Sequence, residues 1–184
     1  MDIKQAVVTR KSIRGFKPDP VPRDVLREII EAAVRAPSSD NSQPWEIYVL
    51  QGEPLDKIRE ENITALEAGV AGRDYAPYEP TYRKRQVDLA IPADKSLDLQ
   101  TASSDVGGLA QTICLLALAH DLGSCILGQS ITYENVVRKH TGIPESQNIL
   151  LSIALGYPDN DFPANQVWSE RDPIDINTSW VGFD

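Results

Sequence analysis

The chain has 184 residues, a length that favours one domain with a full hydrophobic core. Hydrophobic residues make up 41% of it and charged residues 24%, which excludes global disorder, a collagen-like chain and a disulfide-built miniprotein. The formal net charge of −9 argues against a nucleic-acid partner, because neutralising a phosphate backbone needs a basic surface.

The first third of the chain predicts two helices and a strand. Residues 2–10 place apolar side chains at helical spacing, and the range 22–37 predicts a second helix that starts near one proline and stops at another. A polar loop follows over 38–44. The run 45–50 is rich in aromatic and branched residues and therefore predicts a strand.

The middle of the chain predicts two further helices around a less regular region. A helix is expected over 55–70, and a short strand over 87–91. Between them, Tyr75, Tyr78 and Tyr82 with the basic run that follows are candidates for a substrate lip. The range 104–122 predicts a long helix that is apolar on most faces, which indicates deep burial or a subunit interface.

The last third alternates short strands and a helix before an extended arm. Strands are expected over 124–127 and 149–155, with a helix over 133–141 between them. Residues 157–184 hold three prolines and predict an arm without regular structure. Large aromatic side chains in this arm argue that it wraps on a neighbouring molecule, because disordered tails rarely carry them: Trp168, Trp180 and Phe183.

Cysteine, histidine and targeting signals indicate a cytoplasmic protein. Cys114 and Cys125 stand in apolar surroundings, as reduced buried thiols do. His120 and His140 have no partner at metal-ligand spacing, so no metal site is expected. The N-terminus is polar and lacks a signal peptide, and the apolar stretch 106–119 is shorter than the roughly 20 residues of a membrane span. No membrane partner is expected.

Charge is distributed unevenly along the chain. Residues 1–40 hold eight basic and six acidic side chains, whereas the remainder holds ten and twenty-one. Within 10–17 four basic residues and no acidic one surround Ser12. Arginine donors and a hydroxyl suit a phosphate group, which carries about −1.5 to −2 charge. This segment is a candidate anion site, and the alternative is a solvated basic turn.

Several familiar catalytic patterns are missing from the sequence. It contains no Gly-x-Gly-x-x-Gly after a strand, no Walker-type Gly-Lys-Ser/Thr and no Gly-x-Ser-x-Gly elbow. The two histidines show no Ser-His-Asp arrangement. An anion site with few candidates for acid–base catalysis suits an enzyme whose cofactor carries the chemistry.

Four motifs follow one another along the chain. They are RKSIR at 10–14, APSSDNSQPW at 36–45, LGSCILG at 122–128, and ALGYP at 154–158 with RDPI beyond it at 171–174. Each is weak alone, but their order and their places on the expected elements resemble the nitroreductase family of flavoproteins. The resemblance covers 1–55 and 103–184 and fails over 56–102, where this chain is short for the family.

The resemblance implies an α+β fold with a mostly antiparallel sheet flanked by helices, in an intertwined homodimer. Residues 1–156 would form one FMN-binding domain, and the arm 157–184 would pack on the partner subunit. The long apolar helix would lie in the dimer core, and FMN would sit at the interface.

The resemblance also assigns residues to the flavin. Arg10, Ser12 and Arg171 match its phosphate and ribityl contacts, with Lys11 beside them, and Arg14 matches a cation near the pyrimidine edge. The residues that approach the flavin from the other subunit are matched by Ser38, Ser39 and Asn41. The segment whose backbone borders the flavin ring and its N5 is matched by Ile126, Leu127 and Gly128.

The function implied is an FMN-dependent oxidoreductase. Hydride would pass from NAD(P)H through flavin N5 to a small aromatic or quinone-like acceptor in a ping-pong cycle, with no side-chain nucleophile. One alternative is a specialised flavin reaction such as reductive dehalogenation or enoate-type reduction. Others are a non-redox flavin-binding or interaction protein with a degenerate site, and a phospho-ligand module that uses 10–17.

Overall fold

The computed structural model describes residues 1–73 and 97–183. The strand expected over 87–91 and the candidate lip residues Tyr75, Tyr78 and Tyr82 lie outside the described residues.

Most of the expected elements are confirmed, with ends shifted by a few residues. The helices are α1 (Ile3–Thr9), α2 (Arg23–Ala33), α3 (Glu53–Glu67), α5 (Leu97–Ala119), α6 (Glu134–Thr141) and the short α7 (Ile174–Asn177); the strands are β1 (Gly123–Leu127) and β2 (Ser152–Gly156). Single 3-10 turns occur at η1 (Ser39–Asn41), η2 (Gln129–Ile131) and η3 (Pro163–Gln166).

Local signals account for several of these ends. The Asp2 carboxylate accepts a hydrogen bond from the backbone N–H of Gln5 and so caps the start of α1. Helix α6 ends at Gly142, whose φ of 73° is left-handed and suits glycine. Basic side chains fill the last turn of α6, where they complement the helix dipole.

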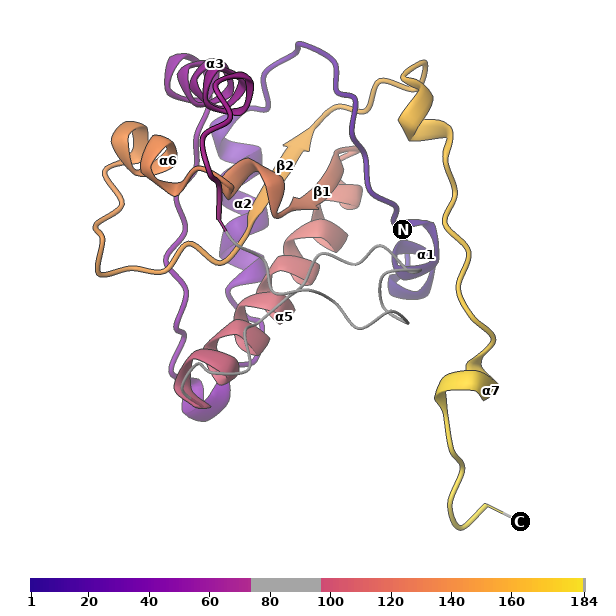
Figure 1. Cartoon of the computed structure of the whole chain (residues 1–184). Coiled ribbons are helices and arrows are strands. Elements are labelled where there is room, and N and C mark those ends of the chain that lie inside the picture. Colours follow the sequence, from indigo (N-terminus) through magenta and orange to yellow (C-terminus); the bar gives the residue numbers. More distant parts are fainter. Residues whose placement is uncertain (74–96, 184) are drawn as a thin grey trace.

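Helix α5 runs through the middle of the body, with α2 packed along it and the strand pair beside it (Figure 1). Buried apolar side chains of the two helices and of the chain beside them form one cluster: Val21, Ile29, Ala33, Leu109, Ile113, Ala117 and Leu122. The partly buried Ile153 and Leu155 of β2 pack against this cluster. Helices α3 and α6 pack on one another on one side of α5, and α1 lies on the other. The expectation that the long apolar helix is buried is confirmed for this face.

The strands β1 and β2 form an antiparallel pair whose register runs from Gly123 opposite Gly156 to Leu127 opposite Ser152. The strand expected over 45–50 is wrong, because the segment is not part of any strand pair in the described chain. Its Trp45 packs on the core, while Ile47, Tyr48 and Val49 stay exposed. An apolar run becomes a strand only where a neighbour takes up its backbone hydrogen bonds.

One stretch of α5, Gln100–Ala119, is long and apolar enough to cross a membrane by length and composition. The expectation that this region is too short is therefore wrong, because the apolar character begins earlier than 106. The core helix of a soluble protein passes the same test. Leu109, Ile113 and Ala117 of this stretch pack in the core on one face, while 28% of the stretch as a whole is buried within the protomer.

The chain after η3 leaves the body and runs away from it through α7 to the C-terminus (Figure 1). Its large apolar side chains are exposed: Val167, Trp168, Ile174, Ile176, Trp180, Val181 and Phe183. Only the part after Gln166 therefore extends from the body. The first part of the range 157–184 packs on the same protomer, where Asn165 is buried and Phe162 covers Gly15.

Candidate functional site

Residues 10–17, called the basic strip below, lie along the end of the strand pair. Ser12 forms a parallel bridge with Ser124 of β1, and the N–H of Ile13 donates to the Ser124 carbonyl at 2.9 Å. Further on, Phe16 bridges Pro158, and the N–H of Lys17 donates to the Tyr157 carbonyl at 2.8 Å. The strip therefore has a backbone fixed at both ends.

A glycine in β1 makes this close approach possible. A Cβ added at Gly123 would lie 2.7 Å from Cγ1 and 2.9 Å from Cβ of Ile13, closer than side-chain atoms come. Ile13 is buried against this glycine. The basic strip thus lies nearer to β1 than any other residue at 123 would allow.

The side chains of the strip offer uncommitted donors. Arg10 follows α1 and is half-buried, Ser12 is half-buried and Arg14 is exposed. Within the part of the chain that the structure describes, none of these three side chains makes a hydrogen bond or ion pair. Two guanidinium groups and a hydroxyl on one short fixed segment fit a phosphate group.

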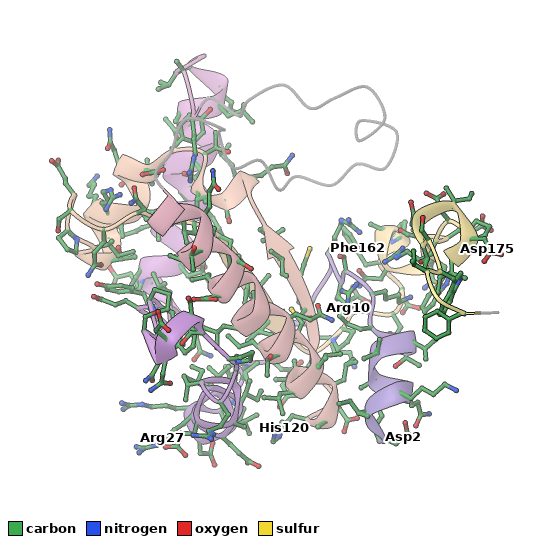
Figure 2. All side chains as sticks on the ribbon, turned by 90° about the horizontal axis from the view of Figure 1, so that it is seen from below. Asp2, Arg10, Arg27, His120, Phe162 and Asp175 are labelled. Atoms are coloured by element: carbon green, nitrogen blue, oxygen red, sulfur yellow. The ribbon has the colours of Figure 1, made fainter. Side chains whose placement is uncertain are left out.

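One side chain of the strip is bonded to another part of the chain, and one thiol near the strip has a shifted pKa. The Lys11 ammonium donates to the backbone carbonyl of Asn165 and is therefore turned into the protein. Burial raises the pKa of the Cys114 thiol, while a hydrogen bond with Ser124 and the positive charge of Arg10 lower it less strongly. Arg10 and Phe162 lie on the same side of the molecule, near the start of the arm (Figure 2).

The segment Ile126, Leu127 and Gly128 lies at the end of β1, two residues beyond Ser124. The bridge between Ser12 and Ser124 is isolated, and the strip then crosses the end of the strand pair to the bridge between Phe16 and Pro158. Within one chain, Ser12 of the strip thus pairs two residues before Ile126, while Ile13 and Phe16 lie against Gly123 and Gly156 at the other end of the strand pair.

The loop that carries Ser38, Ser39 and Asn41 lies elsewhere on the protomer. The N–H of Ser39 donates to a carboxylate oxygen of Asp105 at 3.0 Å, near the start of α5. Arg10 acts instead on Cys114, further along that helix. Because an α-helix rises about 1.5 Å per residue, Asp105 and Cys114 are about 14 Å apart along the axis. One protomer does not bring this loop to the strip.

The same loop has an unusual backbone. Asp40, Asn41 and Gln43 have positive φ angles of 50°, 54° and 46°. Aspartate and asparagine adopt this region readily, whereas glutamine does so at a cost. The hydroxyl of Ser38 accepts the Gln43 N–H at 3.0 Å and supports the turn. Strained non-glycine residues that are held in this way cluster at functional sites.

Arg171 is also apart from the strip. It lies on the exposed arm, where its Nη1 donates to the carbonyls of Ser169 at 3.0 Å and Glu170 at 3.1 Å. Of the predicted groups, the strip is thus paired with β1 at Ser124, the loop 38–41 is bonded to Asp105 of α5, and Arg171 lies on the exposed arm.

A model of the nitroreductase family matches residues 7–157, most of the chain. The chain belongs to the nitroreductase family. It is 26% identical to a 4-nitrobenzoate reductase from Pseudomonas putida, over all of this chain and 97% of that protein. It is 32% identical to an NADH dehydrogenase from Thermus thermophilus, over 93% of this chain and 94% of that one.

The fold agrees with solved members of the family. The crystal structure of the FMN-dependent nitroreductase NfnB from Mycobacterium smegmatis in complex with NADPH matches with a TM-score of 0.81 and 27% identity, over 98% of this chain and all of that chain. The α+β fold expected from the motifs is therefore confirmed. The alignment with the Pseudomonas putida protein spans 227 positions against 184 residues here, so that relative carries residues without a counterpart in this shorter nitroreductase-family chain.

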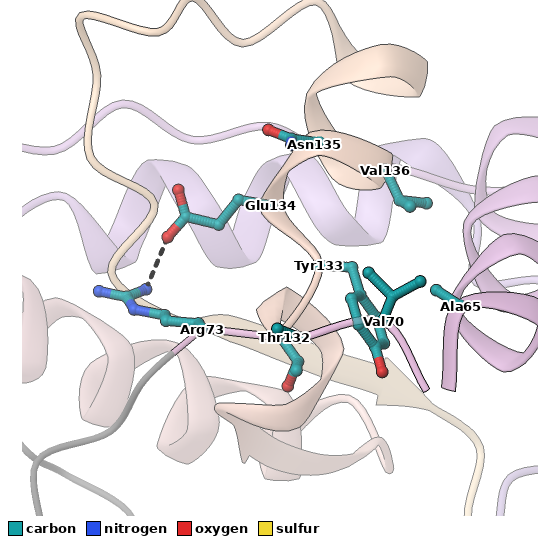
Figure 3. A pocket seen from close by; sticks show the side chains of 10 residues that line it. Ala65, Val70, Arg73, Thr132, Tyr133, Glu134, Asn135 and Val136 are labelled. Atoms are coloured by element: carbon teal, nitrogen blue, oxygen red, sulfur yellow. Dashed lines mark ion pairs between the residues drawn. The ribbon is translucent and has the colours of Figure 1, made fainter. Parts of the chain in front are cut away.

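Away from the strip, this nitroreductase-family protein has a pocket of about 310 Å³ between the end of α3 and the start of α6 (Figure 3). It is lined by Ala65, Val70 and Tyr133 among others. Beside it, Glu134 pairs with Arg73 and Arg138 at 3.1 Å each, and Arg73 also donates to the Ile149 carbonyl at 2.8 Å. These ion pairs hold residues 69–73 against α6, across α5 from α1.

The sequence patterns miss two residues that shape the candidate site. Asp105 anchors the loop 38–43 through the Ser39 N–H, and Asn165 contacts the basic strip. Neither belongs to a recognisable motif, because each acts on a segment that only folding brings near. Asn165 follows the Pro-Ala pair of η3, where nothing local distinguishes it from a turn residue.

Proposed function

We propose that this nitroreductase-family protein is an FMN-dependent oxidoreductase that transfers hydride from NAD(P)H to a small aromatic or quinone-like acceptor. The observation that carries the proposal is the set of uncommitted donors on a fixed strip beside the end of β1. The names of the relatives support it: one is called a 4-nitrobenzoate reductase, and the NfnB structure is described as FMN-dependent and in complex with NADPH.

The donor set fits the phosphate of FMN. Arg10 and Ser12 would hold the phosphate, with Arg171 contributing from the arm, and Arg14 would place a positive charge near the pyrimidine edge. The backbone of 126–128 would border the ring. Lys11 would support the strip rather than reach the phosphate, because its ammonium is bonded to the Asn165 carbonyl.

When bound, FMN supplies the two-electron chemistry at N5, between the nicotinamide and the acceptor. The residues of this chain bind, orient and stabilise charge, and none is required as a nucleophile. The guanidinium of Arg14 would stabilise negative charge that develops beside it during the transfer. The proposed cycle is ping-pong, with oxidised nicotinamide leaving before the acceptor enters.

A second copy of the chain would complete this site. The loop with Ser38, Ser39 and Asn41 is bonded to Asp105, about 14 Å along α5 from Cys114, the residue that senses the charge of Arg10. The arm and α1 also expose apolar side chains, including Ile3, Val7 and Trp180, which isolated proteins seldom do over contiguous surfaces. A homodimer that exchanges arms would bury these surfaces and bring the loop of one subunit to the strip of the other.

The proposed location is the cytoplasm. Both cysteines are free and buried, which suits a reducing compartment. A small-molecule electron acceptor is the proposed partner.

The deciding test is an anaerobic absorbance spectrum of the protein after incubation with FMN and desalting, before and after NADPH and then NADH. Flavin bands that persist through desalting and bleach with either nicotinamide support the proposal. Bands that persist without bleaching favour a non-redox flavin protein, and a colourless protein overturns the enzyme assignment.

A further inference from the structure

One buried asparagine holds the middle of the basic strip. Asn165, in η3, is 3% exposed, and its side-chain amide makes four hydrogen bonds to backbone groups. Its Oδ1 accepts from the N–H groups of Arg14 at 2.7 Å and Gly15 at 3.2 Å. Its Nδ2 donates to the carbonyls of Gly15 at 2.7 Å and Asp159 at 2.8 Å. These bonds use the donors and acceptors of a primary amide in full.

The strip needs such a partner between its two fixed ends. Ile13 is bonded to β1 and Lys17 to the chain after β2, but the N–H groups of Arg14 and Gly15 have no strand partner. Buried backbone groups are almost always hydrogen-bonded, because leaving one unpaired is costly. The amide of Asn165 takes the place of the missing strand, 150 positions away in the sequence.

Other contacts of the same segment reinforce this hold. The main-chain carbonyl of Asn165 accepts from the Lys11 ammonium. A Cβ added at Gly15 would lie 2.1 Å from Cγ of Phe162, so Phe162 covers this glycine directly. The held Lys11 lies between the free donors of Arg10 and Ser12, and the held positions 14 and 15 follow them.

We propose that Asn165 is a positioning residue for the phosphate end of the flavin. It does not touch the phosphate but fixes the backbone at Arg14 and Gly15, directly after the segment that sets the spacing between Arg10 and Ser12. Recognition of a phosphate by several donors depends on that spacing. The inference rests on the proposed function, since it concerns the same site.

Riboflavin separates this role from a purely structural one, because it carries the ring and ribityl chain of FMN without the phosphate. The experiment measures the dissociation constants of FMN and riboflavin by fluorescence quenching for the full-length protein and for Asn165→Ala. Both flavins share the ring near which Arg14 is proposed to lie, so the readout is the preference for FMN, the ratio of the two dissociation constants. Asn165→Ala is expected to reduce this preference about tenfold, the factor of one lost hydrogen bond to a charged group. The exposed neighbour Asn160→Ala is the matched control and should change neither dissociation constant.

The outcomes distinguish the two proposals. A wild-type protein that binds neither flavin removes the proposed function and this inference with it. If the wild type prefers FMN and Asn165→Ala weakens both flavins equally, the function stands and the positioning role is wrong. If the alanine variant does not fold, Asn165→Asp keeps the acceptor for Arg14 and Gly15 and loses both donors. It should lose part of the preference for FMN, and an unchanged preference overturns the inference.

A measurement on the wild-type chain completes the test. The amide hydrogens of Arg14 and Gly15 should exchange with solvent as slowly as that of Ile13 in the protein without flavin, because Asn165 already holds them. Rapid exchange at Arg14 and Gly15 that slows only when FMN is added would show that the ligand, and not Asn165, orders the strip. That result would contradict the inference.

Discussion

The basic strip and the C-terminal arm both carry cations that are proposed to meet the same phosphate, and the chain holds them in opposite ways. The strip is bonded to β1, to the chain after β2 and to Asn165, all within one protomer. The arm carries Trp180 at 62% and Phe183 at 75% exposure, and these two rings pack edge to face on each other at 5.5 Å. The strip is therefore held by contacts within one chain, whereas the arm would gain its contacts from a second copy in the proposed dimer.

The largest expected effect comes from removing the arm. A chain that ends after Gln166 keeps Asn165 and the strip but loses the exposed aromatic residues and Arg171. We expect a monomer in place of a dimer and a loss of FMN retention, because the apolar surface that drives association is gone. Analytical ultracentrifugation and absorbance after desalting measure both. A truncated chain that stays dimeric and yellow would contradict the exchanged arm.

The next prediction compares the two cations directly. Arg10→Ala should weaken FMN by about 1.5–3 kcal/mol, the scale of a hydrogen bond to a charged group. Arg171→Ala should also weaken FMN in the full-length dimer, because the arm would bring this cation to the same phosphate. Isothermal titration gives both affinities, with the exposed Arg27→Ala as control. Wild-type affinity in both Arg10→Ala and Arg171→Ala would show that the phosphate binds elsewhere.

A smaller effect tests how tightly the strip is packed. Gly123→Ala places a Cβ 2.7 Å from Ile13 and should lower the free energy of unfolding by about 1–3 kcal/mol, the usual cost of overpacking. Gly107→Ala on α5 meets nothing within 4 Å and should raise it by about 0.5–1 kcal/mol, because alanine favours a helix. Urea denaturation separates the two. Equal stability of both variants would refute the close approach of the strip to β1.

The smallest expected effect concerns a contact between α3 and α6, which lies far from both the basic strip and the arm. Glu61 on α3 accepts from Lys139 at 2.8 and 3.0 Å and contacts His140 at 2.9 Å, and these partners lower the pKa of Glu61 in that order. A lowered pKa contributes stability above the ordinary value of 4.5 and loses it as the pH falls further.

Glu61→Gln should therefore be less stable than the wild type at pH 7, with a difference that shrinks as the pH falls below 4.5. Thermal unfolding across this range measures it, and Glu60→Gln on the same helix is the control. A difference independent of pH would mean that the α3–α6 contact does not depend on the charge of Glu61.

Patterns along the chain predicted the elements whose cause is local. Periodicity located α2, α3 and α6, and the glycine after α6 marked its end. The four motifs identified the family and indicated which segments to examine: the strip 10–17, the segment 126–128 and the loop 38–41. The strand expected over 45–50 failed because a strand needs a partner, and periodicity reports only which side chains are apolar.

The amino-acid sequence by itself thus determined the family, the helical core and the basic character of the strip. Only the tertiary structure decided which residues support the site. It placed Asn165 and Asp105 against segments distant in sequence, and it separated the loop 38–41 from the strip along α5. Such contacts depend on where the chain returns in space, and hydrogen bonds between distant positions leave no local pattern.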